Sequence, residues 1–378
     1  MKRELVLAVC VALGSGCGGG DQGQDDGPRS AMGEIARSLH TLLSLGLRPE
    51  VFADEANRAM ISGALAELAA GGATLESHTA SQEPAFAHLG ARLATDTREA
   101  QRRFDDGRAD EARFLLGDLA RNCIACHSRL PSDSSELAEE LFSDVEPAEL
   151  SPLQRIRLEI ATRQFDLALD SCEALFTSDA VSAAELDLDG VLLEYLLVAL
   201  RVKNDPARAR KGLERVAARS DVPEVLAKYL GAWIATLNDL AKREPLDDGL
   251  SEGLVLLREA QEQREDPSDR SVLVQAVAAS GWFHRFLATG PEKKRKAAEA
   301  YYLLAMAERM IGRSVLSEVE FYLETCIRTQ PHSPIAIQAY GMLEEEVRRD
   351  HEGAGGANIP PERKTHLDAM RALATGTG

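Results

Sequence analysis

Two cysteines and a histidine stand together in Cys123-Ile124-Ala125-Cys126-His127, a C-x-x-C-H pattern. Thiols three residues apart lie on one side of a helical turn, where each can add across a vinyl group of one porphyrin. The histidine after the second thiol is then held beneath the ring, where it can bind the iron as proximal ligand. With 6 Cys and 8 His in 378 residues, such a pattern is expected by chance about 0.002 times. The motif predicts one covalently attached haem c.

Other roles for the two thiols fit the sequence less well. A structural zinc site needs a second Cys or His pair at short spacing, and the sequence has none. A thioredoxin-like thiol pair opens a helix, where the helix dipole lowers the thiol pKa. Here the motif is expected to close a helix instead.

The N-terminus resembles a bacterial lipoprotein signal. Residues 1–3 carry positive charge, residues 5–13 are apolar but too short to span a bilayer, and small residues lead to Cys17. The resemblance implies a signal peptide at 1–16 and lipidation of Cys17. Gly14 stands where this family usually has leucine, so an ordinary cleaved signal is the alternative. Residues 17–29, rich in Gly, Asp and Gln, are expected to form a flexible tether.

Export and haem attachment support each other, because haem is attached to C-x-x-C-H proteins outside the cytoplasmic membrane. No later segment is apolar for long enough to span a membrane. We therefore expect the protein on the periplasmic side of a bacterial membrane, held by lipid only and by preference at the outer membrane, not in the cytoplasm.

The remaining cysteines are expected to be structural. Cys10 falls in the signal, whereas Cys172 and Cys326 lie on predicted helices far apart in the sequence. Small buried core residues are favoured over a disulfide for this pair.

The net charge of −18 argues against binding to nucleic acid or to anionic lipid. The charge is uneven, since residues 132–378 carry −14 and residues 17–131 carry −5. An acidic second half favours solubility first, and it would also favour a basic redox partner.

An all-α protein is predicted, because 3.6-residue periodicity recurs along the chain and alternating strand patterns are missing. Residues 30–131 read as four helices. The second covers residues 49–70 and stops at Gly71-Gly72, and the third starts after Pro84, with His78 in the polar loop before it. The expected buried stripes are Met32, Ile35, Leu39 and Leu42 in the first helix, Phe86, Leu89, Leu93, Ala100 and Phe104 in the third, and Ala112, Leu116, Leu119, Cys123 and Cys126 in the fourth. The haem thiols thus continue a core stripe, which would set the porphyrin against the core of the bundle.

Four helices with C-x-x-C-H at the end of the last one resemble the class II cytochromes c, the cytochrome c-prime group and its low-spin relatives. In the class I fold the motif comes early and a methionine ligand follows. Here no methionine follows Pro131 until Met306. The resemblance covers residues 30–131 and implies a four-helix-bundle monohaem domain with His127 as the proximal iron ligand.

Residues 134–352 continue as predicted helical hairpins. Residues 163–169 give an aromatic-x-x-Ala-aliphatic pattern that resembles the second helix of a tetratricopeptide repeat. A looser copy begins at Pro206, and residues 319–331 hold the clearest, with Cys326 at a small buried position. The resemblance implies an α-solenoid suited to protein–protein contacts; an irregular helical domain is the alternative. Residues 353–378 are expected to form a tail with a short helix.

The sixth iron ligand decides the chemistry of such a haem. In the low-spin class II relatives a methionine near the start of the first helix crosses to the iron, and Met32 matches that position. An ordinary core methionine is the alternative, and His40, His88 and His78 are weaker ligand candidates.

Three functions remain open from the sequence, and no catalytic set is found, so an enzyme is not expected. The first is one-electron transfer by a lipid-anchored monohaem cytochrome whose solenoid docks a redox partner. The second is binding of a small gas such as NO or CO by a high-spin, cytochrome c-prime-like haem. The third is mainly a scaffold.

Overall fold

The computed structural model describes residues 26–46, 49–80, 84–127, 151–186, 190–246, 248–266, 268–312, 318–353 and 356–376. These residues form an all-α protein, as predicted, with one antiparallel pair of two-residue strands, β1 (Glu352–Gly353) and β2 (Gly356–Ala357). Within this described part, none of the helices has the length and hydropathy of a membrane span. The signal peptide, Cys17 and most of the tether fall outside the described residues.

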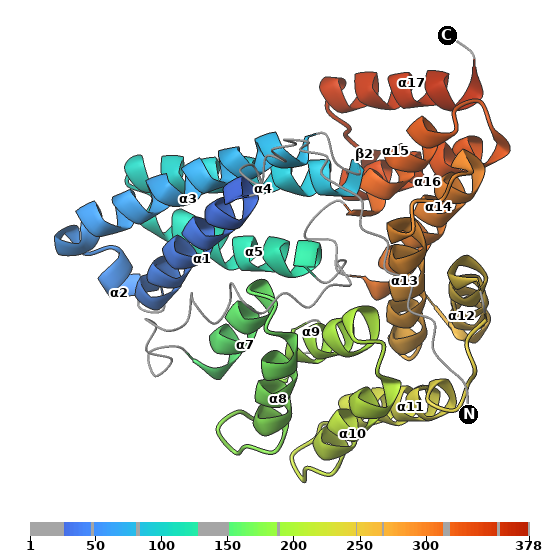
Figure 1. Ribbon diagram of the computed structural model, residues 1–378, viewed down its shortest axis with the longest axis horizontal. Coiled ribbons are helices and arrows are strands. Elements are labelled where there is room, and N and C mark those ends of the chain that lie inside the picture. The colour runs from blue at the N-terminus through green and yellow to red at the C-terminus, as the bar shows by residue number, and fades with distance from the viewer. Residues whose placement is uncertain are drawn as a thin grey trace, which may run out of the picture.

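The helices fall into two groups along the chain (Figure 1). The N-terminal group comprises α1 (Asp26–Gly46), α2 (Pro49–Phe52), η1 (Glu55–Asn57), α3 (Arg58–Thr79), α4 (Pro84–Asp105) and α5 (Ala109–His127). The C-terminal group comprises α7 (Pro152–Ala161), α8 (Phe165–Phe176), α9 (Val191–Leu196), η3 (Leu197–Val202), α10 (Pro206–Ala217), α11 (Glu224–Leu240), α12 (Gly249–Gln263), α13 (Leu273–Ala288), α14 (Lys294–Ile311), α15 (Glu318–Thr329), α16 (Pro334–Asp350) and α17 (Pro361–Thr375).

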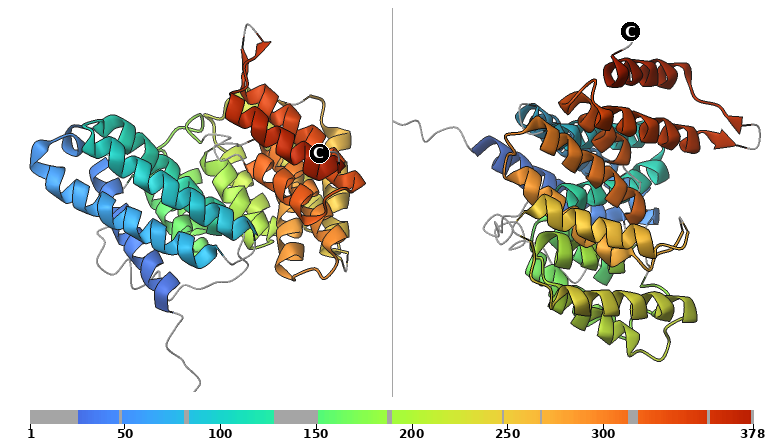
Figure 2. Two further views of the ribbon diagram at one scale, coloured as in Figure 1. Left: turned by 90° about the horizontal axis from the view of Figure 1, so that it is seen from above. Right: turned by 90° about the vertical axis from the view of Figure 1, so that its right-hand side faces the viewer.

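Four long helices of the N-terminal group, α1, α3, α4 and α5, pack side by side around one core (Figure 2, left). Ser38 Oγ on α1 donates to Glu67 Oε2 on α3 at 3.3 Å. A Cβ built on Gly46, at the end of α1, would lie 3.7 Å from Cγ of Arg113, near the start of α5. The helices therefore alternate in direction, which places the start of α1 and the end of α5 at the same end of the group.

The predicted inward stripes are buried wherever they are described, except at Met32, which is half-buried. The core of the N-terminal group contains Ile35, Leu39 and Leu42 of α1, Leu93, Ala100 and Phe104 of α4, and Ala112, Leu116 and Leu119 of α5. Burial of one such side chain contributes about 1.5–3 kcal/mol.

The prediction that a helix stops at Gly71-Gly72 is wrong, because α3 continues through both glycines to Thr79. Their function is close packing. A Cβ on Gly71 would lie 2.7 Å from Ile35 Cγ1 on α1, and one on Gly72 would lie 2.7 Å from Thr97 Oγ1 on α4. A glycine pair reads as a stop signal in a sequence, but here it lets α1 and α4 approach α3 from two sides.

The start of this segment also differs from the prediction. Instead of one helix from residue 49, a short helix α2 and the turn η1 come first, and Asp54 caps η1 by accepting a hydrogen bond from the backbone N–H of Ala56. His78 lies in the last turn of α3 and not in a loop.

The C-terminal group curves around the N-terminal group from α7 to α17 (Figure 1). Most successive helices pack as neighbours around one large core, and α11 packs on α13. Several of the repeat-like positions are buried, among them Ala168 on α8, Ala209 on α10 and Leu323 on α15, whereas Pro331 is exposed. Cys172 and Cys326 are also buried, and neither forms a disulfide, in agreement with the prediction.

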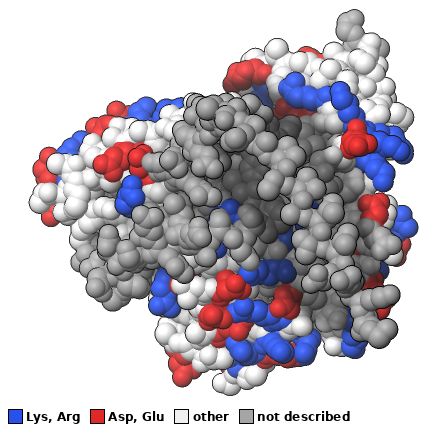
Figure 3. All heavy atoms as spheres, in the orientation of Figure 1, with Lys and Arg blue, Asp and Glu red and all other residues white. Residues whose placement is uncertain are grey.

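Charged side chains of both signs are mixed over the C-terminal group, as around α8 and α10 in Figure 3. There Arg208 bonds Glu173 at 2.7 Å and also bonds Asp170. One ion pair is internal: Arg201 on η3 bonds Glu308 on α14 at 2.8 Å, with both side chains buried.

Among the described helices, the most extensive contacts between the two groups lie at two places. The end of α5 packs against α7. The start of α4 meets α15, where the His88 ring stacks on Phe321 with ring centroids 4.2 Å apart.

Candidate haem site

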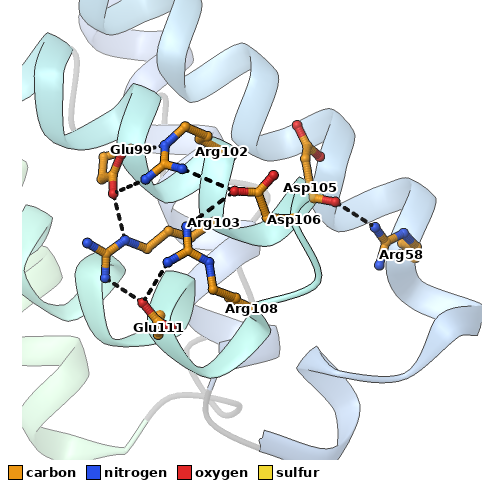
Figure 4. A network of polar contacts seen from close by, with 8 residues as sticks. All are labelled: Arg58, Glu99, Arg102, Arg103, Asp105, Asp106, Arg108 and Glu111. Atoms are coloured by element: carbon orange, nitrogen blue, oxygen red, sulfur yellow. Dashed lines mark hydrogen bonds and ion pairs between the residues drawn. The ribbon is translucent and has the colours of Figure 1, made fainter.

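A network of ion pairs fixes the turn that sends α5 back along α4 (Figure 4). Glu99 accepts hydrogen bonds from Arg102 at 2.7 Å and from Arg103 at 2.7 Å, which lower its pKa to about 2. Arg103 also donates to Glu111 on α5 at 2.7 Å. Gly107, with φ of 80°, supplies the left-handed residue that the turn requires. Exposed pairs contribute little singly, but this network ties α4 to the first turn of α5.

The C-x-x-C-H motif forms the last turn and a half of α5, as the sequence predicted. The buried stripe of α5 runs through Leu116 and Leu119 toward the motif. The helical positions of Cys123 and Cys126 are described, but their side chains fall outside the described part of the structure.

His127, the last residue of α5, is 8% exposed. Its ring hydrogen-bonds the backbone carbonyl of Ala161, the last residue of α7, and its Nδ1 is buried without a hydrogen-bond partner. Burial, together with the positive charge of Arg163, lowers the pKa of His127 to about 4, while the bond to Ala161 acts in the opposite direction. The imidazole is therefore neutral at pH 7.

These features fit an iron ligand. A metal needs a neutral imidazole with a bare nitrogen, and ligating histidines commonly donate their other N–H to a carbonyl, which fixes the ring. His127 has one nitrogen engaged by Ala161 and one buried nitrogen with a free lone pair. An orphaned buried nitrogen costs free energy unless something binds it, so the residues present fit a haem held through Cys123, Cys126 and His127.

Met32 lies near the start of α1, and therefore at the same end of the N-terminal group as His127. Its side chain is half-buried and packs against the core of that group. The structure thus places Met32 and His127 at the same end of the helices, and ligation by Met32 stays a prediction.

The weaker ligand candidates have other surroundings. His88 stacks on Phe321 of α15, and His78 is at the end of α3. His40 is half-buried two turns beyond Met32 on α1.

Two residues beside His127 were missed from the sequence, Ala161 and Arg163. They lie more than thirty positions after the motif and belong to a different helical group. Neither has a sequence signal that relates it to haem, because only the packing of α7 on α5 brings them there.

No protein-family model, curated protein or solved structure matches this chain. A function must therefore be argued from the motif and from the surroundings of His127.

Proposed function

We propose that this chain is an exported, lipid-anchored monohaem c-type cytochrome that carries single electrons. In this proposal α1, α3, α4 and α5 form a four-helix haem bundle of the class II type, and the helices from α7 onward form a tetratricopeptide-like solenoid that docks a redox partner. The observation that carries the proposal is the C-x-x-C-H motif at the end of α5, with a buried and neutral His127.

The residues of the site have separate tasks in this proposal. Cys123 and Cys126 hold the porphyrin covalently, and His127 presents a lone pair from a fixed ring. Met32, at the same end of the helices, would complete the iron with a neutral thioether. Haem c, when bound, supplies one-electron chemistry at the iron, with a potential set by these ligands and their surroundings.

The packing around the site supports electron transfer more than catalysis. Ile35 and Leu39 pack with Met32 in an apolar core, and burial in such surroundings is one of the means by which a protein sets the reduction potential of a haem.

The partner is proposed to bind the C-terminal group, whose net charge favours a basic protein. Over α8 and α10 the acidic side chains alternate with arginines (Figure 3). Recognition there would thus depend on paired charges and on shape rather than on one broad acidic field.

Absorption spectra of the purified protein, oxidised, reduced and under carbon monoxide, test this function. An electron carrier with a methionine ligand should show a sharp reduced α band, a weak near-infrared band when ferric, and little change with carbon monoxide. A high-spin spectrum that changes fully under carbon monoxide would replace electron transfer by gas binding. A protein without haem absorption would refute both.

A further inference from the structure

Ala161 lies at the end of α7, in the C-terminal group, but its side chain packs in the core of the N-terminal group. Ile160, just before Ala161, and Phe165, at the start of α8, are part of the large C-terminal core. Ala161, 6% exposed, packs in the N-terminal core with Leu116 and Leu119 of α5. The end of α7 therefore forms part of the surroundings of His127.

The backbone at this point is arranged to expose a carbonyl. After α7 the N–H of Arg163 bonds the carbonyl of Ile160 at 3.0 Å, and the N–H of Gln164 bonds that of Glu159 at 2.8 Å. These two hydrogen bonds form a Schellman ending, which satisfies the two carbonyls that precede Ala161. The carbonyl of Ala161, at the negative end of the helix dipole, accepts from His127.

Arg163 occupies a position in this ending that glycine usually takes. Its φ is 63°, in the left-handed region that side chains disfavour. A strained residue that persists in a tight turn calls for a reason outside the turn. Arg163 lies two residues after Ala161, whose carbonyl holds the ring of His127, and its guanidinium charge acts on that ring.

We propose that the turn between α7 and α8 completes the proximal side of the haem site, with Ala161 orienting His127 and Arg163 as a positioning residue that raises the reduction potential. This inference rests on the proposed function. Ferric iron carries one more positive charge than ferrous iron, so a nearby guanidinium disfavours the oxidised form. The C-terminal group would then tune the haem as well as dock a partner.

The test compares midpoint potentials of the full-length haem protein, measured by spectroscopic redox titration. Arg163→Gly removes the charge and also relieves the backbone, whereas Arg163→Lys keeps the charge. Arg210→Gln is the matched control, because it removes one arginine from α10, where Arg210 pairs only with Glu214 among the ion pairs described.

The expected result is a lower potential in Arg163→Gly, with a urea midpoint equal to or above that of the wild type. Arg163→Lys and Arg210→Gln should keep the wild-type potential. If Arg163 had only a structural role, Arg163→Gly would change the urea midpoint and leave the reduction potential of the haem unchanged.

The outcomes separate the two proposals. A haem-containing wild type whose potential is the same in Arg163→Gly, or shifts equally in Arg210→Gln, overturns the role of Arg163 and leaves the proposed cytochrome function intact. A wild type without covalent haem overturns both.

Discussion

Replacing Gly72 by alanine should destabilise the N-terminal group, although alanine is the better helix former. The new Cβ would lie 2.7 Å from Thr97 Oγ1 and 3.2 Å from Ala94 Cα, and both residues are fully buried. Thr97 would have to turn away from the Ala94 carbonyl, to which it donates at 3.1 Å. The backbone at Ala94 is part of α4, so it cannot move aside as readily as the Thr97 side chain can.

The magnitude follows from three opposing effects. Overpacking of a filled core costs about 1–3 kcal/mol, and loss of the Thr97 hydrogen bond costs about 1 kcal/mol. Replacing glycine by alanine in a helix interior stabilises the helix by about 1 kcal/mol. We expect Gly72→Ala to be less stable than the wild type by about 2 kcal/mol.

Gly63 is the matched control, since it lies on the same helix and a Cβ there meets nothing within 4 Å. Gly63→Ala should therefore be more stable by about 0.5–1 kcal/mol. The assay is urea unfolding followed by hydrogen exchange of the α3 amides, which reports this group separately from the larger C-terminal core. The packing argument fails if Gly72→Ala is as stable as Gly63→Ala.

Three further predictions concern the anchor, the distal ligand and pH. Cys17→Ser should abolish lipoprotein processing and the acyl group, and mass spectrometry that finds cleavage elsewhere without acylation would leave a soluble exported protein. Met32→Ala should convert the haem to a high-spin form that binds carbon monoxide; an unchanged low-spin spectrum would assign the sixth ligand to another residue, such as His40. Burial raises the pKa of Glu159 to about 7, so its contribution to stability is fully present below about pH 4.5 and is lost as the pH rises through 7. Wild-type protein should lose about 3 kcal/mol across this range, Glu159→Gln should lose less, and equal urea midpoints of the two proteins at every pH would contradict the assignment.

The helices and their inward faces were predictable because their periodicity is local. The buried stripe of α1, which includes Ile35 and Leu39, follows from apolar residues three and four positions apart. The start of α4 follows from Pro84, its first residue. The turn before α5 is likewise local, because Gly107 supplies its left-handed residue.

The course of α3 was not predictable, because Gly71 and Gly72 have two opposite meanings. A glycine pair ends a helix when it lies in solvent and permits close packing when other helices cross it. Which meaning applies depends on Ile35 and Thr97, residues that only the fold brings near.

The candidate site shows the same division. The bond between His127 and Ala161, and the left-handed Arg163, depend on how α7 docks on α5, for which no local pattern exists. The motif itself was recognisable because five consecutive residues carry its chemistry.

Covalent haem attachment is the central claim, and haem staining of the exported protein on a denaturing gel tests it most directly. The account predicts one haem-dependent peroxidase band at the size of the full chain. The band should survive acid–acetone extraction and be absent from the Cys123→Ala, Cys126→Ala double variant. A wild type that does not stain, or a double variant that stains equally, would contradict the account.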